Sequence, residues 1–165
     1  MNDNLPKRKP NRLENFDYGA GYSYFITICT KDRAQILSSI TTVGAAIGRP
    51  QDVALTQNGQ IVDEAINNIS QIYPTVSVDY YVIMPNHVHL LLTIHETAEN
   101  GRPMAAPTLA RVINKLKGFA TKKSGNPLWQ KLYYDHIIRN KKDYEEISKY
   151  IYENPINWET DEFYN

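Results

Sequence analysis

The sequence predicts one α+β domain in which an antiparallel sheet is covered by helices. The length of 165 residues suits a single domain, residues 1–165, with a sizeable core. Apolar runs of strand length alternate with stretches in which apolar residues recur every three to four positions. Glycine and proline separate these segments. The resulting order is strand, helix, strand, strand, helix, strand, helix.

The amino-terminal half supplies the first strand and the first helix. An apolar run predicts a strand over about residues 22–29. Residues 38–58 show little periodicity, which predicts a long irregular segment with a short strand near 53–55. Helical spacing of apolar residues then predicts an amphipathic helix over 59–73, which Pro74 ends.

A β-hairpin is expected in the middle of the chain. The runs 78–84 and 87–92 are rich in Val, Ile, Leu and Tyr, and they flank the turn-forming pair Pro85-Asn86. The segment 96–107 contains one glycine and two prolines and predicts a flexible loop.

The second half supplies the remaining elements. Thr108 is a candidate N-cap for a helix over about 109–123, and alternation predicts a fourth strand over 132–139. A last helix is expected over 143–153. A β-α-β-β-α-β core is the ferredoxin-like arrangement, an antiparallel sheet with two helices on one face. The extra C-terminal helix would then pack on the open face of the sheet.

Composition argues for a cytoplasmic protein without a membrane segment. Hydrophobic residues make up 42% and charged residues 22% of the chain, which is ordinary for a globular protein. No run approaches the roughly 18 apolar residues of a membrane span. The first ten residues lack the apolar segment of a signal peptide, and residues 1–18 predict a flexible basic tail.

Two histidines give the sequence its first candidate site. His87 and His89 stand one residue apart in an expected strand, so both side chains leave the sheet on the same side and Val88 on the other. Two imidazoles placed in this way can coordinate one metal ion. A structural role for both histidines is the alternative.

The charges are unevenly distributed. Net charge is zero, with 18 basic and 18 acidic residues. Between residues 111 and 142, however, nine basic residues accompany one acid, whereas from residue 143 onwards seven acids accompany one lysine. This separation suits a basic patch for nucleic acid, although a solvated helix face would look the same.

Tyr150 is a second candidate for chemistry. Tyr144, Ile147 and Ile151 form the expected buried stripe of the last helix, and Tyr150 and Asn154 lie one turn apart beside it. Tyr150 would therefore face the sheet. A packing role is the alternative, because the chain contains twelve tyrosines.

Several motifs together resemble the REP-associated tyrosine transposases, within the IS200-like, single-tyrosine class of histidine-hydrophobe-histidine nucleases. The likeness covers about residues 20–158. The motifs occur in the family's order and are Pro85-Asn86-His87-Val88-His89-Leu90-Leu91, Leu128-Trp129-Gln130, Tyr134-Asp135-His136-Ile137-Ile138-Arg139-Asn140, Asp143-Tyr144 and Tyr150-Ile151-Tyr152-Glu153-Asn154-Pro155.

The resemblance implies an enzyme that cleaves and rejoins single-stranded or hairpin-forming DNA through a 5′-phosphotyrosine, commonly as a homodimer. Tyr150 matches the nucleophile, and His87 and His89 match the metal-binding pair. Asn154 matches the residue that can complete the metal site, where the classical insertion-sequence enzymes tend to have glutamine. The implied cofactor is Mg²⁺ or Mn²⁺.

DNA contact is expected from the basic residues. Phosphate contacts would give affinity and a strong dependence on salt. The candidates are Arg111, Lys115, Lys122, Arg139, Lys142 and, in the amino-terminal tail, Lys7, Arg8 and Lys9.

Two other functions remain open from the sequence. One is a non-catalytic, sequence- or hairpin-specific DNA-binding protein that retains the fold. The other is a small metal phosphodiesterase that uses water as the nucleophile. The near-zero net charge is compatible with the first, whereas the intact His87, His89 and Tyr150 argue against it. The second would cleave DNA equally well in a Tyr150→Phe variant.

Overall fold

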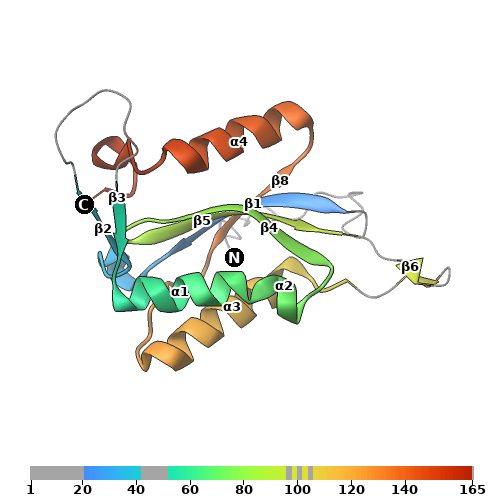
Figure 1. Ribbon diagram of the computed structural model, residues 1–165, viewed down its shortest axis with the longest axis horizontal. Coiled ribbons are helices and arrows are strands. Elements are labelled where there is room, and N and C mark those ends of the chain that lie inside the picture. The colour runs from blue at the N-terminus through green and yellow to red at the C-terminus, as the bar shows by residue number, and fades with distance from the viewer. Residues whose placement is uncertain (1–20, 42–51, 96–97, 100–101, 104–105, 165) are drawn as a thin grey trace, which may run out of the picture.

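A four-stranded antiparallel sheet separates two helical layers (Figure 1). The computed structural model describes residues 21–41, 52–95, 98–99, 102–103 and 106–164. The strands of the sheet, in spatial order, are β4 (Val76–Ile83), β5 (His87–Ile94), β1 (Tyr22–Cys29) and β8 (Tyr134–Ile138). This order places the first strand inside the sheet and confirms the predicted ferredoxin-like arrangement.

The helices divide between the two faces of the sheet. One face carries α1 (Gln57–Asn67), α2 (Ile69–Ile72) and α3 (Leu109–Ser124), whereas α4 (Lys141–Glu153) lies on the other face (Figure 1). The extra C-terminal helix therefore packs on the face that the ferredoxin-like core leaves open, as predicted.

The remaining elements are short. They are the hairpin of β2 (Ser38–Thr41) and β3 (Asp52–Leu55), the pair β6 (Ala98–Glu99) and β7 (Arg102–Pro103), and two 3₁₀ helices, η1 (Lys31–Arg33) and η2 (Trp158–Thr160). No helix in the described ranges is long and apolar enough to cross a membrane.

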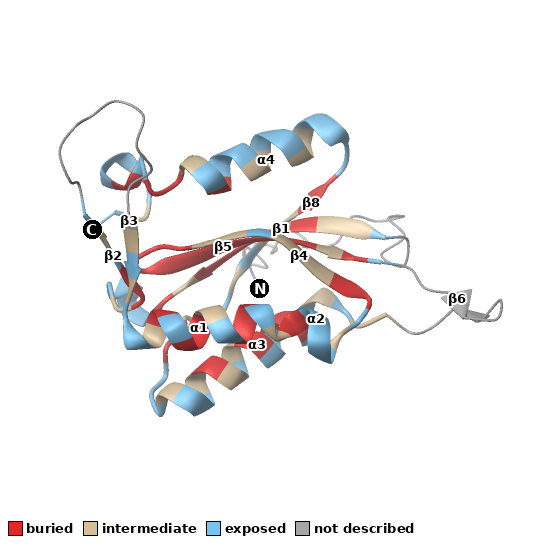
Figure 2. Ribbon diagram, in the orientation of Figure 1, coloured by how far each residue is buried: buried red, intermediate tan, exposed pale blue. Residues whose placement is uncertain are grey.

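The register of the sheet decides which side chains share a face. In β5, Val88, Leu90 and Leu92 belong to the main core, which lies between the sheet and α1 and α3 (Figure 2). His87 and His89 project from the other face of the sheet, where His89 lies against Tyr150 of α4 and His87 against the segment that follows α4. The predicted hairpin and the predicted alternation of β5 are therefore confirmed.

A smaller core holds α4 on the sheet. It consists of Leu91 from β5, Ile138 from β8 and Ile151 from α4, with Tyr144 and Ile147 partly buried around them. Ile151 is the buried residue of α4 among those that the structure describes, so this helix makes a thinner contact than α1 and α3 do. Its position consequently depends on a few side chains.

Side-chain caps explain where the helices begin. Thr56 accepts a hydrogen bond from the Gly59 amide at the start of α1, and the Asn140 side chain accepts from the Asp143 amide at the start of α4. Thr108 caps α3, as predicted. A Cβ at Gly59 would clash with the Leu37 carbonyl oxygen, so this turn requires glycine.

Some local predictions were wrong. The helix expected over 59–73 begins at Gln57 and is divided at Asn68 into α1 and α2, and Ile72 near its end is 44% exposed. The fourth strand is shorter than predicted, since Leu132 is 60% exposed before it. α4 begins at Lys141 because Asn140 caps it. The predicted tail, residues 1–18, lies outside the described residues.

Replacing Leu90 by alanine should test the main core. Leu90 is fully buried, so we expect the free energy of unfolding to fall by about 2–5 kcal/mol in a urea titration. Leu132→Ala is the matched control, because this leucine is 60% exposed, and its effect should stay within about 0.5 kcal/mol. Equal losses in the two variants would contradict the assignment of the core.

Candidate active site

The two histidines of β5 form a close, buried pair. Their Nε2 atoms are 3.0 Å apart, and the exposed fractions of His87 and His89 are 0% and 1%. Two neighbouring ligands of an octahedral ion with bonds near 2.1 Å lie about 3.0 Å apart. The same distance is that of an N–H···N hydrogen bond, so the two rings can bond to each other or, with both Nε2 atoms deprotonated, hold a six-coordinate divalent ion.

The outer nitrogen of each ring is held by a polar side chain. His87 Nδ1 is 2.9 Å from Asn86 Oδ1, and His89 Nδ1 is 2.9 Å from Thr27 Oγ1. Because an amide oxygen only accepts, His87 carries its proton on Nδ1 and presents the lone pair of Nε2. Support of this kind orients the histidine ligands of metal sites. Neither Asn86 nor Thr27 was predicted as a site residue.

Burial keeps both imidazoles uncharged at neutral pH. Loss of solvent lowers the pKa of His87 to about 4, although the Asp161 carboxylate and the Asn154 side chain act in the opposite direction. Burial and the neighbouring His87 lower the pKa of His89 as well. Both rings are therefore neutral, and His89 can act as a ligand through Nε2 when its proton is on Nδ1, next to Thr27 Oγ1.

The lowered pKa of His87 predicts that acid destabilises the protein. With a chelator present, the unfolded chain takes up a proton near pH 6.5 and the folded chain only near pH 4, so stability falls as the pH drops through this range. We expect His87 to contribute a loss of about 2 kcal/mol between pH 7.5 and pH 5. His87→Asn should show a flatter dependence in urea titrations over this interval. An unchanged slope would contradict the burial of an uncharged His87.

Tyr150 of α4 lies next to the histidine pair. Its hydroxyl lies 3.5 Å from His89 Nε2, and its side chain is still 41% exposed. Phe25 of β1 lies against it, with the ring centroids 5.9 Å apart. Partial burial raises the pKa of Tyr150, and the nearby Asp161 and Glu162 raise it further. The phenol is thus protonated at neutral pH and open to solvent on one side.

Asn154, one turn after Tyr150, is almost completely buried. Its Nδ2 donates to Asp161 Oδ2 over 3.0 Å. Within the described part of the chain, its Oδ1 has no hydrogen-bond partner. Because the Asn154 side chain acts on the pKa of His87, it lies close to that ring, and an amide oxygen is a good ligand for Mg²⁺ and Mn²⁺.

The segment after α4 closes over the histidines. The Phe163 ring lies 4.6 Å from the His87 ring, and Asn86 Nδ2 donates to the Phe163 carbonyl over 2.7 Å. Ligand atoms of His87, His89 and Asp161 all lie within 4.8 Å of one another. Asp161 was not predicted as a site residue, because it follows the last helix in a stretch without periodicity.

The predicted DNA-contact residues do not gather around Tyr150. Arg111, Lys115 and Lys122 are exposed on α3, across the sheet from α4 (Figure 1). Arg139 and Lys142 are exposed next to the start of α4. The predicted contacts Lys7, Arg8 and Lys9 fall outside the described residues.

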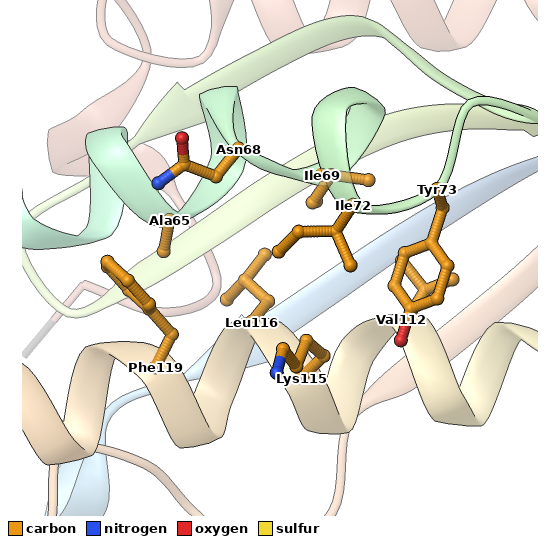
Figure 3. Close-up of a pocket in the computed structure, with 9 residues that line it drawn as sticks. All are labelled: Ala65, Asn68, Ile69, Ile72, Tyr73, Val112, Lys115, Leu116 and Phe119. Atoms are coloured by element: carbon orange, nitrogen blue, oxygen red, sulfur yellow. The ribbon is translucent and has the colours of Figure 1, made fainter.

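Lys115 borders a shallow hollow on the face that carries α3. Ile69 and Ile72 of α2 face Leu116 and Phe119 of α3 across it (Figure 3). The hollow is mainly apolar and lies on the opposite side of the sheet from the histidine pair.

Comparison with known proteins identifies the family. The chain matches the family described as "Transposase IS200 like" over residues 20–154. An uncharacterized protein of Haemophilus influenzae is 31% identical, covering 99% of this chain and 96% of its own length. A REP-associated tyrosine transposase of Escherichia coli is 28% identical, covering 62% of this chain and 57% of its own length.

A solved structure supports the fold. It is described as a REP-associated tyrosine transposase bound to a REP hairpin, with a TM-score of 0.61 and 24% identity over 89% of this chain and 74% of that chain. The family predicted from the sequence motifs is confirmed by the family match over residues 20–154. The chain belongs to the IS200-like transposase family.

Proposed function

We propose that this transposase is a metal-dependent enzyme that cleaves and rejoins single-stranded DNA next to a hairpin through Tyr150. The proposal rests on the position of the Tyr150 hydroxyl, which lies 3.5 Å from Nε2 of His89 in the histidine pair. The hairpin is proposed because the solved relative is described as bound to one. The exposed side of Tyr150 provides a route for a DNA backbone.

The proposed metal ligands are His87, His89 and Asn154, with Mg²⁺ or Mn²⁺ as the ion. The spacing of the two Nε2 atoms and the orphaned Asn154 Oδ1 fit this ion. When bound, such an ion supplies positive charge that polarises a scissile phosphate oxygen and favours deprotonation of a nearby phenol. Asn86 and Thr27 hold the two rings in position for this task.

Tyr150 is the proposed nucleophile. Its phenolic oxygen, after losing its proton, attacks phosphorus and forms the 5′-phosphotyrosine bond. The bond from phosphorus to the 3′ oxygen breaks, and that oxygen takes up a proton as the free 3′-hydroxyl. Because the phosphodiester is retained in the covalent link, attack by a 3′-hydroxyl reverses the step and joins strands.

The proposal includes the partners that were expected from the sequence. Arg111, Lys115 and Lys122 would bind phosphates on the α3 side, and Arg139 and Lys142 near the start of α4. Because these groups lie on both sides of the sheet, DNA that contacts all of them must pass around the sheet or between two protomers. A homodimer in the cytoplasm, as expected from the sequence, is part of the proposal.

The test is a cleavage assay with a labelled single strand that contains a hairpin, in the presence of Mn²⁺. We expect a protein–DNA band that survives denaturation and carries the 5′ phosphate, together with a fragment that ends in a 3′-hydroxyl. Cleavage without such a band would contradict the tyrosine mechanism.

The burial of the histidines favours one alternative function. With His87 and His89 almost fully covered and Phe163 against His87, a protein that binds hairpin DNA without cleaving it would have the same interior. In the assay above, such a protein would shift the labelled hairpin in a native gel and leave it intact.

A further inference from the structure

Asp161 is brought back to the histidine pair by the segment that follows α4. The chain passes through η2, where Trp158 is buried with its ring 6.0 Å from the His87 ring. Phe163 packs 4.6 Å from His87 two residues after Asp161. The two aromatic side chains thus hold the segment on either side of Asp161, at the histidines.

Both oxygens of the Asp161 carboxylate are oriented by hydrogen bonds. Oδ2 accepts from Asn154 Nδ2 over 3.0 Å, and Oδ1 accepts from the Phe163 amide over 2.7 Å. A carboxylate has about four acceptor positions, so each oxygen keeps a lone pair. Hydrogen bonds of this kind commonly support carboxylates that bind metals.

Asn154 provides an independent indication of a cation. Its side chain is 1% exposed, and within the described residues its Oδ1 has no partner. An unpaired buried amide oxygen is destabilising, and a cation bound to it would remove this destabilisation. Asn154 can therefore bind an ion through Oδ1 and orient Asp161 through Nδ2 at the same time.

We infer that Asp161 is a further ligand of the divalent ion, supplied by the segment after α4. This inference rests on the proposed function, which places an ion at His87 and His89. The site then has four protein donors, two imidazole nitrogens and two oxygens, and an octahedral ion keeps two positions for substrate oxygens or water. The carboxylate also contributes negative charge and a hard oxygen, which suit Mg²⁺ and Mn²⁺.

The competing explanation is a purely structural Asp161 that stabilises the turn to Phe163. The variant Asp161→Asn removes the negative charge and keeps one oxygen that can accept from the Phe163 amide, but it replaces the oxygen that accepts from Asn154 Nδ2 with a donor, so it needs a charge-retaining companion. Asp161→Glu complements it, since it keeps the charge on a side chain one methylene longer.

The experiment is calorimetric titration of the full chain with MnCl₂ alone, without DNA. We expect Asp161→Asn to bind Mn²⁺ about 10–100-fold more weakly than the unmodified protein and Asp161→Glu to recover part of the loss. Glu159→Gln is the matched control, because this acid is exposed two positions earlier and should leave the affinity unchanged. Circular dichroism checks that each variant is folded.

The outcomes separate this inference from the proposed function. Mn²⁺ binding that is lost in His89→Ala but kept in Asp161→Asn and Asp161→Glu would overturn the role of Asp161 and leave the histidine site standing. Binding that survives in His89→Ala would instead overturn the proposed metal site. An affinity for Mn²⁺ that falls in Asp161→Asn and partly recovers in Asp161→Glu supports the inference.

Discussion

Replacing Tyr150 by phenylalanine should abolish the covalent protein–DNA product. The variant keeps the ring that packs against Phe25 and loses the one oxygen that lies 3.5 Å from His89 Nε2. Removal of a nucleophile typically costs several orders of magnitude in rate, so we expect cleavage to fall at least about 1,000-fold. The measurement is denaturing electrophoresis of a labelled hairpin substrate with Mn²⁺.

Tyr152→Phe is the matched control for this experiment. Tyr152 is on the same helix, but its side chain is 73% exposed and makes no part of the site. This variant should form the covalent product at the normal rate. If Tyr150→Phe cleaved as fast as the unmodified protein, water would be the nucleophile and the phosphodiesterase hypothesis would replace the tyrosine mechanism.

Replacing His89 by alanine should have the second largest effect. The change removes one of the two ring nitrogens, 3.0 Å apart, that are proposed to bind the metal ion. A metal ion contributes several kcal/mol to the stabilisation of charge in a phosphoryl-transfer transition state, so we expect cleavage to fall at least about 100-fold. The cleavage rate should be measured over a series of Mn²⁺ concentrations.

His95→Asn controls for the loss of a histidine elsewhere. His95 is exposed after β5 and contacts Ser77 rather than the active site. The cleavage rate of the His95→Asn variant, and the dependence of this rate on Mn²⁺, should match those of the unmodified protein. Full activity of His89→Ala at the same Mn²⁺ concentrations, with circular dichroism showing a folded protein, would contradict a catalytic ion at this position.

Most of the architecture could be predicted because it follows from local periodicity. Alternation in β5 divides Val88 from the two histidines, and helical spacing in α4 places Tyr150 one turn before Asn154. The predicted ferredoxin-like order and the family were both confirmed. The hairpin of β2 and β3 was only half predicted, because four-residue strands such as Ser38–Thr41 carry too little pattern to be recognised.

The support around the histidines could not be predicted. Thr27 is opposite His89 only because β1 pairs with β5 in the observed register, and the sequence does not specify a register between strands so far apart. Asn86 was interpreted as a turn residue alone. Its contacts with His87 and Phe163 join groups that are close only in the folded chain.

By itself, the sequence determined which residues can do chemistry: a histidine pair on one face of a strand, and a tyrosine with an asparagine on one side of a helix. Such patterns are local, since backbone geometry repeats every two residues in strands and every 3.6 residues in helices. Only the tertiary structure decided that Asp161 joins them. Its segment has no repeat, and its place follows from packing Trp158 and Phe163 against the buried His87 ring.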